Sequence, residues 1–148
     1  MTVMTSAIAH LPAEPPAAFT DPASPVRLRE IPFPAQVELR LDDGSPDASE
    51  TSRFLVLRLP GAGHAAGDGE PYVLWLGPGW YLVVDREGGE TELLAGLPDA
   101  VVVSAARTVL ELSGPSARDV LSHDCPLDLH PRVFGPGRCA QTRLPGCR

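Results

Sequence analysis

Four residues of types that bind zinc occur late in the chain, at His123, Cys125, His130 and Cys139. Imidazole nitrogen and thiolate sulfur are the usual ligands of a structural zinc ion. The ligands are separated by one, four and eight residues, which is not the paired spacing typical of such sites. We therefore expect a buried or half-buried thiol beside loop histidines rather than a metal site, and a small metal-binding module is the weaker alternative.

The same residues could also form a nucleophilic cysteine–histidine pair. Such a pair needs an activating environment and an oxyanion hole, and neither is indicated here. Asp124 and Asp128 could serve as acid and base, yet they flank a loop bent by Pro126, where carboxylates usually cap turns. The sequence therefore predicts no catalytic residue.

Two segments could bind phosphate groups. Gly61–Ala66 matches the dinucleotide-binding pattern G-x-G-x-x-A, but that pattern requires a helix to begin at its end, with N–H groups facing the pyrophosphate. The following residues, 67–71, read Gly-Asp-Gly-Glu-Pro and cannot begin a helix. Ser113–Ser116 precedes a predicted helix, and turn chemistry explains it fully. We predict no cofactor-binding or metal-binding residue in this chain.

Composition excludes several classes of partner. The chain has 148 residues, a formal net charge of -7 and 5% aromatic residues, and its basic residues are all arginine. An acidic chain without a basic cluster argues against binding to nucleic acid or to anionic membranes. The three cysteines form no Cys-x-x-Cys motif, and no apolar run is long enough to span a bilayer. We expect one cytoplasmic domain large enough to bury a core.

Hydrophobic periodicity and turn residues predict an α+β fold with a mainly antiparallel sheet. Residues 1–25 are rich in Ala and Pro and are expected to form a disordered or draped arm, followed by one domain over residues 26–148. The clearest feature is a hairpin around Gly77-Pro-Gly79. The predicted strands are 26–41, 72–76, 80–84, 100–104 and 108–112, and the predicted helices are 90–97 and one that begins near Pro115. Residues 47–59 stay open between two structures, because Phe54–Leu57 has the composition of a strand while Ser45–Asp47 is typical of a helix start.

Two further expectations concern which side chains face the core and which face outward. Leu112 lies on the expected inward face of the strand before Pro115, and Val120 and Leu121 lie on the apolar face of the helix after it. We therefore expect all three in the core. The hairpin carries Tyr72, Trp75, Trp80 and Tyr81, of which half should face the core. The outward pair is a candidate protein interface, where Trp and Tyr are enriched.

Several motifs resemble the gamma subunit of heterotetrameric sarcosine oxidase. They are Arg-Thr-x-Leu-x-Leu-Ser-Gly-Pro-x-Ala-Arg-Asp-Val-Leu at 107–121, Cys-Pro-Leu-Asp-Leu-His-Pro-Arg-x-Phe at 125–134, and Gly-x-Cys-Ala-Gln-Thr at 137–142. Residues 29–40 and 74–78 match in order and spacing as well. The resemblance covers residues 29–142, and it departs at Gly79-Trp-Tyr81, where the family usually has an Asp-Glu-Trp-like segment.

The resemblance implies a non-catalytic structural subunit of an enzyme that oxidatively demethylates sarcosine to glycine. The products would be hydrogen peroxide with formaldehyde or methylene-tetrahydrofolate. FAD, FMN, NAD, tetrahydrofolate and zinc would lie on the alpha, beta and delta partner subunits, and none on this chain. The implied fold is similar to the folate-binding domain of glycine-cleavage aminomethyltransferases, and the resemblance favours a helix over residues 47–59. A free-standing folate-dependent aminomethyl-transfer or repair domain is the alternative.

The family continues beyond the segment that matches Gln141 and Thr142 with a further strand and helix. The resemblance therefore implies a domain that is incomplete at its C-terminus. We expect a strand at 138–142 that lacks a neighbour, because Pro145 cannot donate to a sheet ladder. Such a sheet would have an exposed edge or an uncovered apolar face that favours association.

Overall fold

The computed structural model describes residues 23–32, 34–42, 45–97 and 99–143. These residues form two compact units. The first unit contains described residues from 23–32, 108–129 and 142–143, and the second contains those from 34–107 and 130–141. Both units combine antiparallel strands with short helices, so the predicted α+β class is confirmed. The predicted arm lies mostly outside the described residues.

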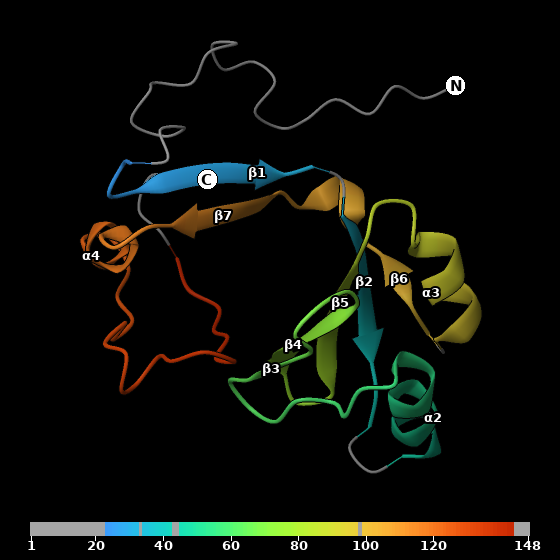
Figure 1. The fold of residues 1–148 in the computed structure, drawn as a ribbon. Coiled ribbons are helices and arrows are strands. Elements are labelled where there is room, and N and C mark those ends of the chain that lie inside the picture. Colours follow the sequence, from blue (N-terminus) through green and yellow to red (C-terminus); the bar gives the residue numbers. More distant parts are fainter. Residues whose placement is uncertain (1–22, 33, 43–44, 98, 144–148) are drawn as a thin grey trace. The chain divides into compact units, whose positions relative to one another are not determined.

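A five-stranded antiparallel sheet is the centre of the second unit (Figure 1). Its spatial order is β3-β4-β5-β2-β6. The alternation of apolar and polar residues along β2 and the hairpin places every second side chain on one face. The strands are β2 (Ala35–Arg40), β3 (Ala65–Ala66), β4 (Tyr72–Gly77), β5 (Trp80–Asp85) and β6 (Val101–Val102).

The predicted hairpin is present as β4 and β5. Gly79 closes the turn with φ of +63°, a conformation that glycine adopts without steric cost. Its carbonyl accepts a hydrogen bond from the Leu41 amide at 2.8 Å. The turn therefore holds the end of β2 against the hairpin.

Helices α2 (Pro46–Leu55) and α3 (Glu90–Gly96) lie on the same side of β2 in Figure 1. The predicted start of α2 is confirmed, because Ser45 caps it by accepting from the Ala48 amide at 3.2 Å. A short 3-10 helix, η1 (Ser104–Ala106), follows β6. The core between this face and the helices contains Ala35, Val37, Leu39, Leu41, Leu55, Val73, Tyr81, Val83, Leu93 and Leu97.

Strand β6 is shorter than the predicted strand 100–104. The Val103 amide donates to the Gln36 carbonyl at 2.8 Å. The Ser104 hydroxyl accepts from the Gln36 amide and donates to the Glu90 carboxylate, each at 2.9 Å. The serine contacts turn the backbone into η1 after two strand residues. Ser104 of η1 thus connects β2 and α3 by hydrogen bonds at this end of the sheet.

The opposite edge of the sheet meets residues 137–141. The Ala65 amide donates to Gly137 at 2.8 Å and the Cys139 amide donates to Gly63 at 3.1 Å, with an antiparallel bridge between His64 and Arg138. The expectation of a strand at 138–142 is wrong. Pro136 and two glycines before the bridge favour a loop, and side chains supply the remaining contacts to the sheet.

The first unit contains an antiparallel pair, β1 (Arg27–Ile31) with β7 (Val109–Ser113), and the short helix α4 (Ala117–Ser122). The single predicted strand 26–41 is therefore wrong. Pro32 and Pro34 have no N–H to donate, and the chain on either side of them enters different sheets, as β1 and β2.

The predicted core position of Leu112, Val120 and Leu121 is also wrong. Val120 is 51% exposed, and Leu112 and Leu121 are only half-buried. A two-stranded sheet and one helix of six residues have little apolar surface with which to cover one another. Helix α4 begins at Ala117, two residues after the predicted start at Pro115, and Ser116 is its N-cap.

Candidate functional site

The hairpin aromatics divide between the two faces of the sheet, as predicted. Tyr81 is in the core and Trp75 packs against it. Trp80 and Tyr72 lie at odd spacings from these residues, so they face the opposite side. On that side Trp80 pairs across the strands with Arg40.

A group of four side chains on this second face, which we call the Trp80 cluster, contains Glu38, Arg40, Trp80 and Arg107. The Trp80 indole N–H donates to a Glu38 carboxylate oxygen at 3.1 Å. Arg107 donates to the other oxygen of the same carboxylate. The Arg40 guanidinium carbon lies 4.0 Å from the centre of a Trp80 ring, within cation–π range.

The charged groups of this cluster differ in whether they have a partner of opposite charge. Glu38 meets two donors, and Arg107 is paired with it. Arg40 stacks on Trp80, and within the described ranges it has no ion pair with a carboxylate. Its side chain is exposed, so its N–H groups are available to an acceptor from outside. Tryptophan and arginine held rigid by neighbours are typical of binding hot spots.

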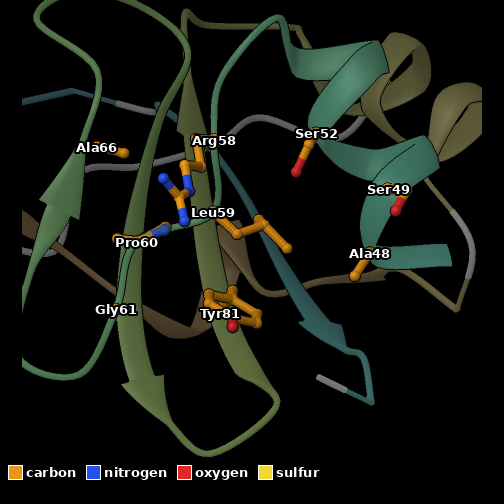
Figure 2. Close-up of a pocket in the computed structure, with 9 residues that line it drawn as sticks. All are labelled: Ala48, Ser49, Ser52, Arg58, Leu59, Pro60, Gly61, Ala66 and Tyr81. Carbon is orange, nitrogen blue, oxygen red and sulfur yellow. The ribbon is translucent and has the colours of Figure 1, made fainter. Parts of the chain in front are cut away.

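A pocket lies between α2 and the sheet (Figure 2), with a volume of ≈ 980 Å³. Ser49 and Ser52 line it from the helix, and Tyr81 lines it from β5. The segment from Arg58 to Gly61 crosses between them, and Ala66 of β3 lies beyond it. The lining residues are Ala48, Ser49, Ser52, Arg58, Leu59, Pro60, Gly61, Ala66 and Tyr81.

Arg58 carries the only formal charge among the described residues that line this pocket. No hydrogen bond or ion pair joins it to any described part of the chain. The pocket thus combines a cation, two hydroxyl groups and apolar walls.

The sequence-predicted zinc ligands divide between the two units. His123 and Cys125 belong to the first unit, whereas His130 and Cys139 belong to the second. Cys139 donates to the backbone carbonyls of His64 and Trp75 at 3.0 and 3.3 Å. Across the described residues, no three His, Cys, Asp or Glu side chains form a group that could hold a metal ion. Cys125 is buried, and both described cysteines are free thiols.

The two phosphate-binding candidates have other roles in the fold. Gly61–Ala66 leads into β3 and not into a helix, as expected from the residues that follow it. At the second candidate, the Ser116 amide donates to the Pro25 carbonyl at 3.0 Å, so this amide is already occupied. Asp124 and Asp128 are exposed. The first segment contributes Gly61 and Ala66 to the lining of the pocket beside α2.

Sequence reasoning missed the partners of Trp80 and the whole pocket. The outward position of Trp80 followed from strand alternation, but β2 is its neighbour only through tertiary pairing. Arg58 gave no signal, because a single arginine after a helix has no motif. Ser49 and Ser52 lie three residues apart, which predicts a shared helix face but not the pocket that the face borders.

Comparison with known proteins gives a consistent result. Residues 42–144 match the model of the family described as sarcosine oxidase, gamma subunit. The sarcosine oxidase subunit gamma of Arthrobacter sp is 45% identical over 130 residues, which cover 82% of this chain and 64% of that protein. The corresponding subunit of Corynebacterium sp. (strain U-96) is 40% identical over 147 residues, covering 94% of this chain and 72% of that protein.

A solved structure is similar as well. It is the heterotetrameric sarcosine oxidase from Corynebacterium sp. U-96 in complex with pyrrole 2-carboxylate. The matched chain superposes with a TM-score of 0.84 at 38% identity, over 95% of this chain and 76% of that chain. The match to the Arthrobacter protein spans 64% of that relative's length.

Proposed function

The chain belongs to the sarcosine oxidase gamma subunit family, and we propose that it acts as a non-catalytic structural subunit of a heterotetrameric sarcosine oxidase. The observation that carries this proposal is the match to a chain of such a complex at a TM-score of 0.84 and 38% identity. Residues 26–148 would act together as one gamma-subunit-like domain.

The assembly would oxidatively demethylate sarcosine to glycine, with hydrogen peroxide and either formaldehyde or methylene-tetrahydrofolate as products. The alpha, beta and delta subunits would hold FAD, FMN, NAD, tetrahydrofolate and zinc. A cytoplasmic location fits the two free thiols. None of the helices in the described ranges has the length and apolar character that crossing a bilayer requires.

We propose the Trp80 cluster as a surface that contacts a partner subunit. Arg40 is exposed and without a carboxylate partner among the described residues, while Glu38 holds Trp80 in place. An acidic side chain of the partner would meet Arg40 by charge-assisted hydrogen bonds. The aromatic ring beneath it would add apolar contact area.

Co-expression with candidate alpha, beta and delta subunits, followed by size-exclusion chromatography, tests both proposals. We expect the chain to elute with the other three subunits. Arg40→Ala and Trp80→Ala should each lower the affinity for the other subunits tenfold or more, the usual effect at a hot spot. A smaller fraction of each variant should therefore elute with the complex. Arg53→Ala on helix α2 removes the same charge from another exposed position and should have no such effect.

The two proposals fail in different ways. If the chain never elutes with the other subunits, the subunit role is wrong. If it does, and the Arg40 and Trp80 variants elute as the unmodified chain does, only the contact surface is wrong. Folding of each variant is checked by circular dichroism. The alternative, a free-standing folate-dependent transferase, would need a pterin pocket with an inward carboxylate, and the pocket beside α2 has no acidic residue among its described lining residues.

A further inference from the structure

The pocket beside α2 has the chemistry of a binding site for an anion. Arg58 is its only formal charge among the described lining residues, and its guanidinium is held by no described carboxylate or carbonyl. A guanidinium presents planar, paired N–H donors that match a carboxylate. No aspartate or glutamate from the described lining competes for them.

Two hydroxyl groups face the same space. Ser49 and Ser52 lie three residues apart on α2 and both line the pocket, and the Ser52 hydroxyl points toward Leu59 in Figure 2. Neither is needed to begin the helix, because Ser45 is the cap. Their hydroxyls are therefore available as donors to a second oxygen of a ligand.

The remaining walls are largely apolar. Leu59 and Pro60 form one side, Ala48 and Ala66 add methyl groups, and the buried Tyr81 contributes from the sheet. A volume of ≈ 980 Å³ is near the upper end of pockets that take small molecules. Such walls would contact the apolar body of a ligand while its charged end meets Arg58.

We propose that this pocket binds a small molecule that carries one carboxylate on an apolar body. Arg58 pairs with the carboxylate, Ser49 and Ser52 donate to it from α2, and the body lies against Leu59 and Pro60. This site is separate from the Trp80 cluster, which lies on the opposite face of the sheet from Tyr81. The inference does not depend on the proposed subunit role.

The test is a titration of the full chain, labelled with ¹⁵N, followed by amide resonances. The probes are sodium benzoate, benzamide as a neutral molecule of the same shape, and sodium phosphate as an anion without an apolar body. Benzoate should shift the amides of Ser49, Ser52, Gly61 and Ala66. Benzamide and phosphate should each bind at least tenfold more weakly, because each lacks one of the two interactions.

Arg58→Gln should weaken benzoate binding at least tenfold, whereas Arg53→Gln, an exposed arginine of α2 outside the pocket lining, should change it less than twofold. Ser52→Ala provides a second variant and should weaken binding severalfold. Equal binding of benzoate and benzamide would overturn the proposal. Equal effects of the two arginine variants, tighter binding of phosphate, or shifts confined to other residues would overturn it as well.

Discussion

The indole N–H of Trp80 donates to the Glu38 carboxylate at 3.1 Å, although the two residues are forty-two positions apart in the sequence. The same carboxylate accepts from Arg107, and Arg40 covers the indole ring. A tryptophan on the second face of the sheet is thus fixed in orientation before any partner arrives. A surface side chain held in this way loses little rotational entropy on binding.

Replacing Glu38 by Gln should release Trp80 without large loss of stability. The charge-assisted bonds weaken, and because Arg107 is partly exposed the cost in unfolding free energy should be about 1 kcal/mol or less. One of the two tryptophan indole N–H resonances should shift and exchange faster with solvent. Glu111→Gln, which breaks the exposed 2.7 Å pair with Arg29, should leave both indole resonances in place. An unchanged Trp80 resonance in Glu38→Gln would contradict the described hydrogen bond.

Adjacent leucines of α3 should differ sharply in their contribution to stability. Leu93 is 2% exposed and packs in the core, whereas Leu94 is 45% exposed. Leu93→Ala should lower the unfolding free energy by about 2–5 kcal/mol, because it removes transfer energy and leaves a cavity. Leu94→Ala should change it by about 0.5 kcal/mol or less. Urea unfolding measures both, and similar costs would mean that the buried face of α3 is wrongly assigned.

Val56→Gly should stabilise the protein. Val56 ends α2 in the left-handed conformation with φ of +55°, and its side chain is almost fully exposed. A β-branched residue is strained there, and glycine is the usual residue at this position. After the entropy cost of glycine we expect a gain of about 0.5–1 kcal/mol.

The matched control is Val133→Gly, since Val133 is also exposed and has no positive φ. It should be neutral or destabilising, because glycine adds freedom to the unfolded chain without relieving strain. Thermal unfolding compares the two variants. A lower melting temperature for Val56→Gly would show that the valine is not strained.

Tyr72 should make stability decrease at alkaline pH. Burial raises the pKa of its phenol above the ordinary value of 10.0, and the nearby Glu70 charge adds to this. Above pH 10 the unfolded chain releases this proton more readily than the folded chain, so the free energy of unfolding decreases as pH rises. Below pH 10 the contribution is fully present.

Tyr72→Phe should remove this component of the pH dependence. The unfolding free energy of the variant and of the unmodified chain, measured by urea between pH 8 and about 11.5, should differ by a constant up to about pH 10 and then diverge in the variant's favour. Parallel curves over the whole range would contradict a raised pKa.

Local chemistry made part of this fold predictable. The hairpin followed from Gly77-Pro-Gly79 between two apolar runs, and the start of α2 matched the helix-start signal at Ser45 and Pro46, although the residues after it left strand and helix open. Caps and turns depend on residues within a few positions, so the sequence contains the necessary information. The same holds for the division of the hairpin aromatics between two faces, because strand alternation has a period of two.

Errors arose wherever the result depended on distant neighbours. Periodicity gave α4 an apolar face, but Val120 is exposed because little apolar surface in its unit covers it. Residues 26–41 read as one strand, although β1 and β2 belong to different sheets. Pattern alone reports which side chains share a face and leaves open what covers that face.

The family motifs and the acidic composition were determined by the sequence itself, because they are properties of residue types and their order. The position of Arg40 over Trp80 and of Arg58 opposite two serines was decided only by the tertiary structure. Each arrangement joins residues from separate elements, through strand pairing in one case and helix-on-sheet packing in the other. Such contacts form when the burial of apolar surface fixes the elements together, and a linear pattern does not specify them.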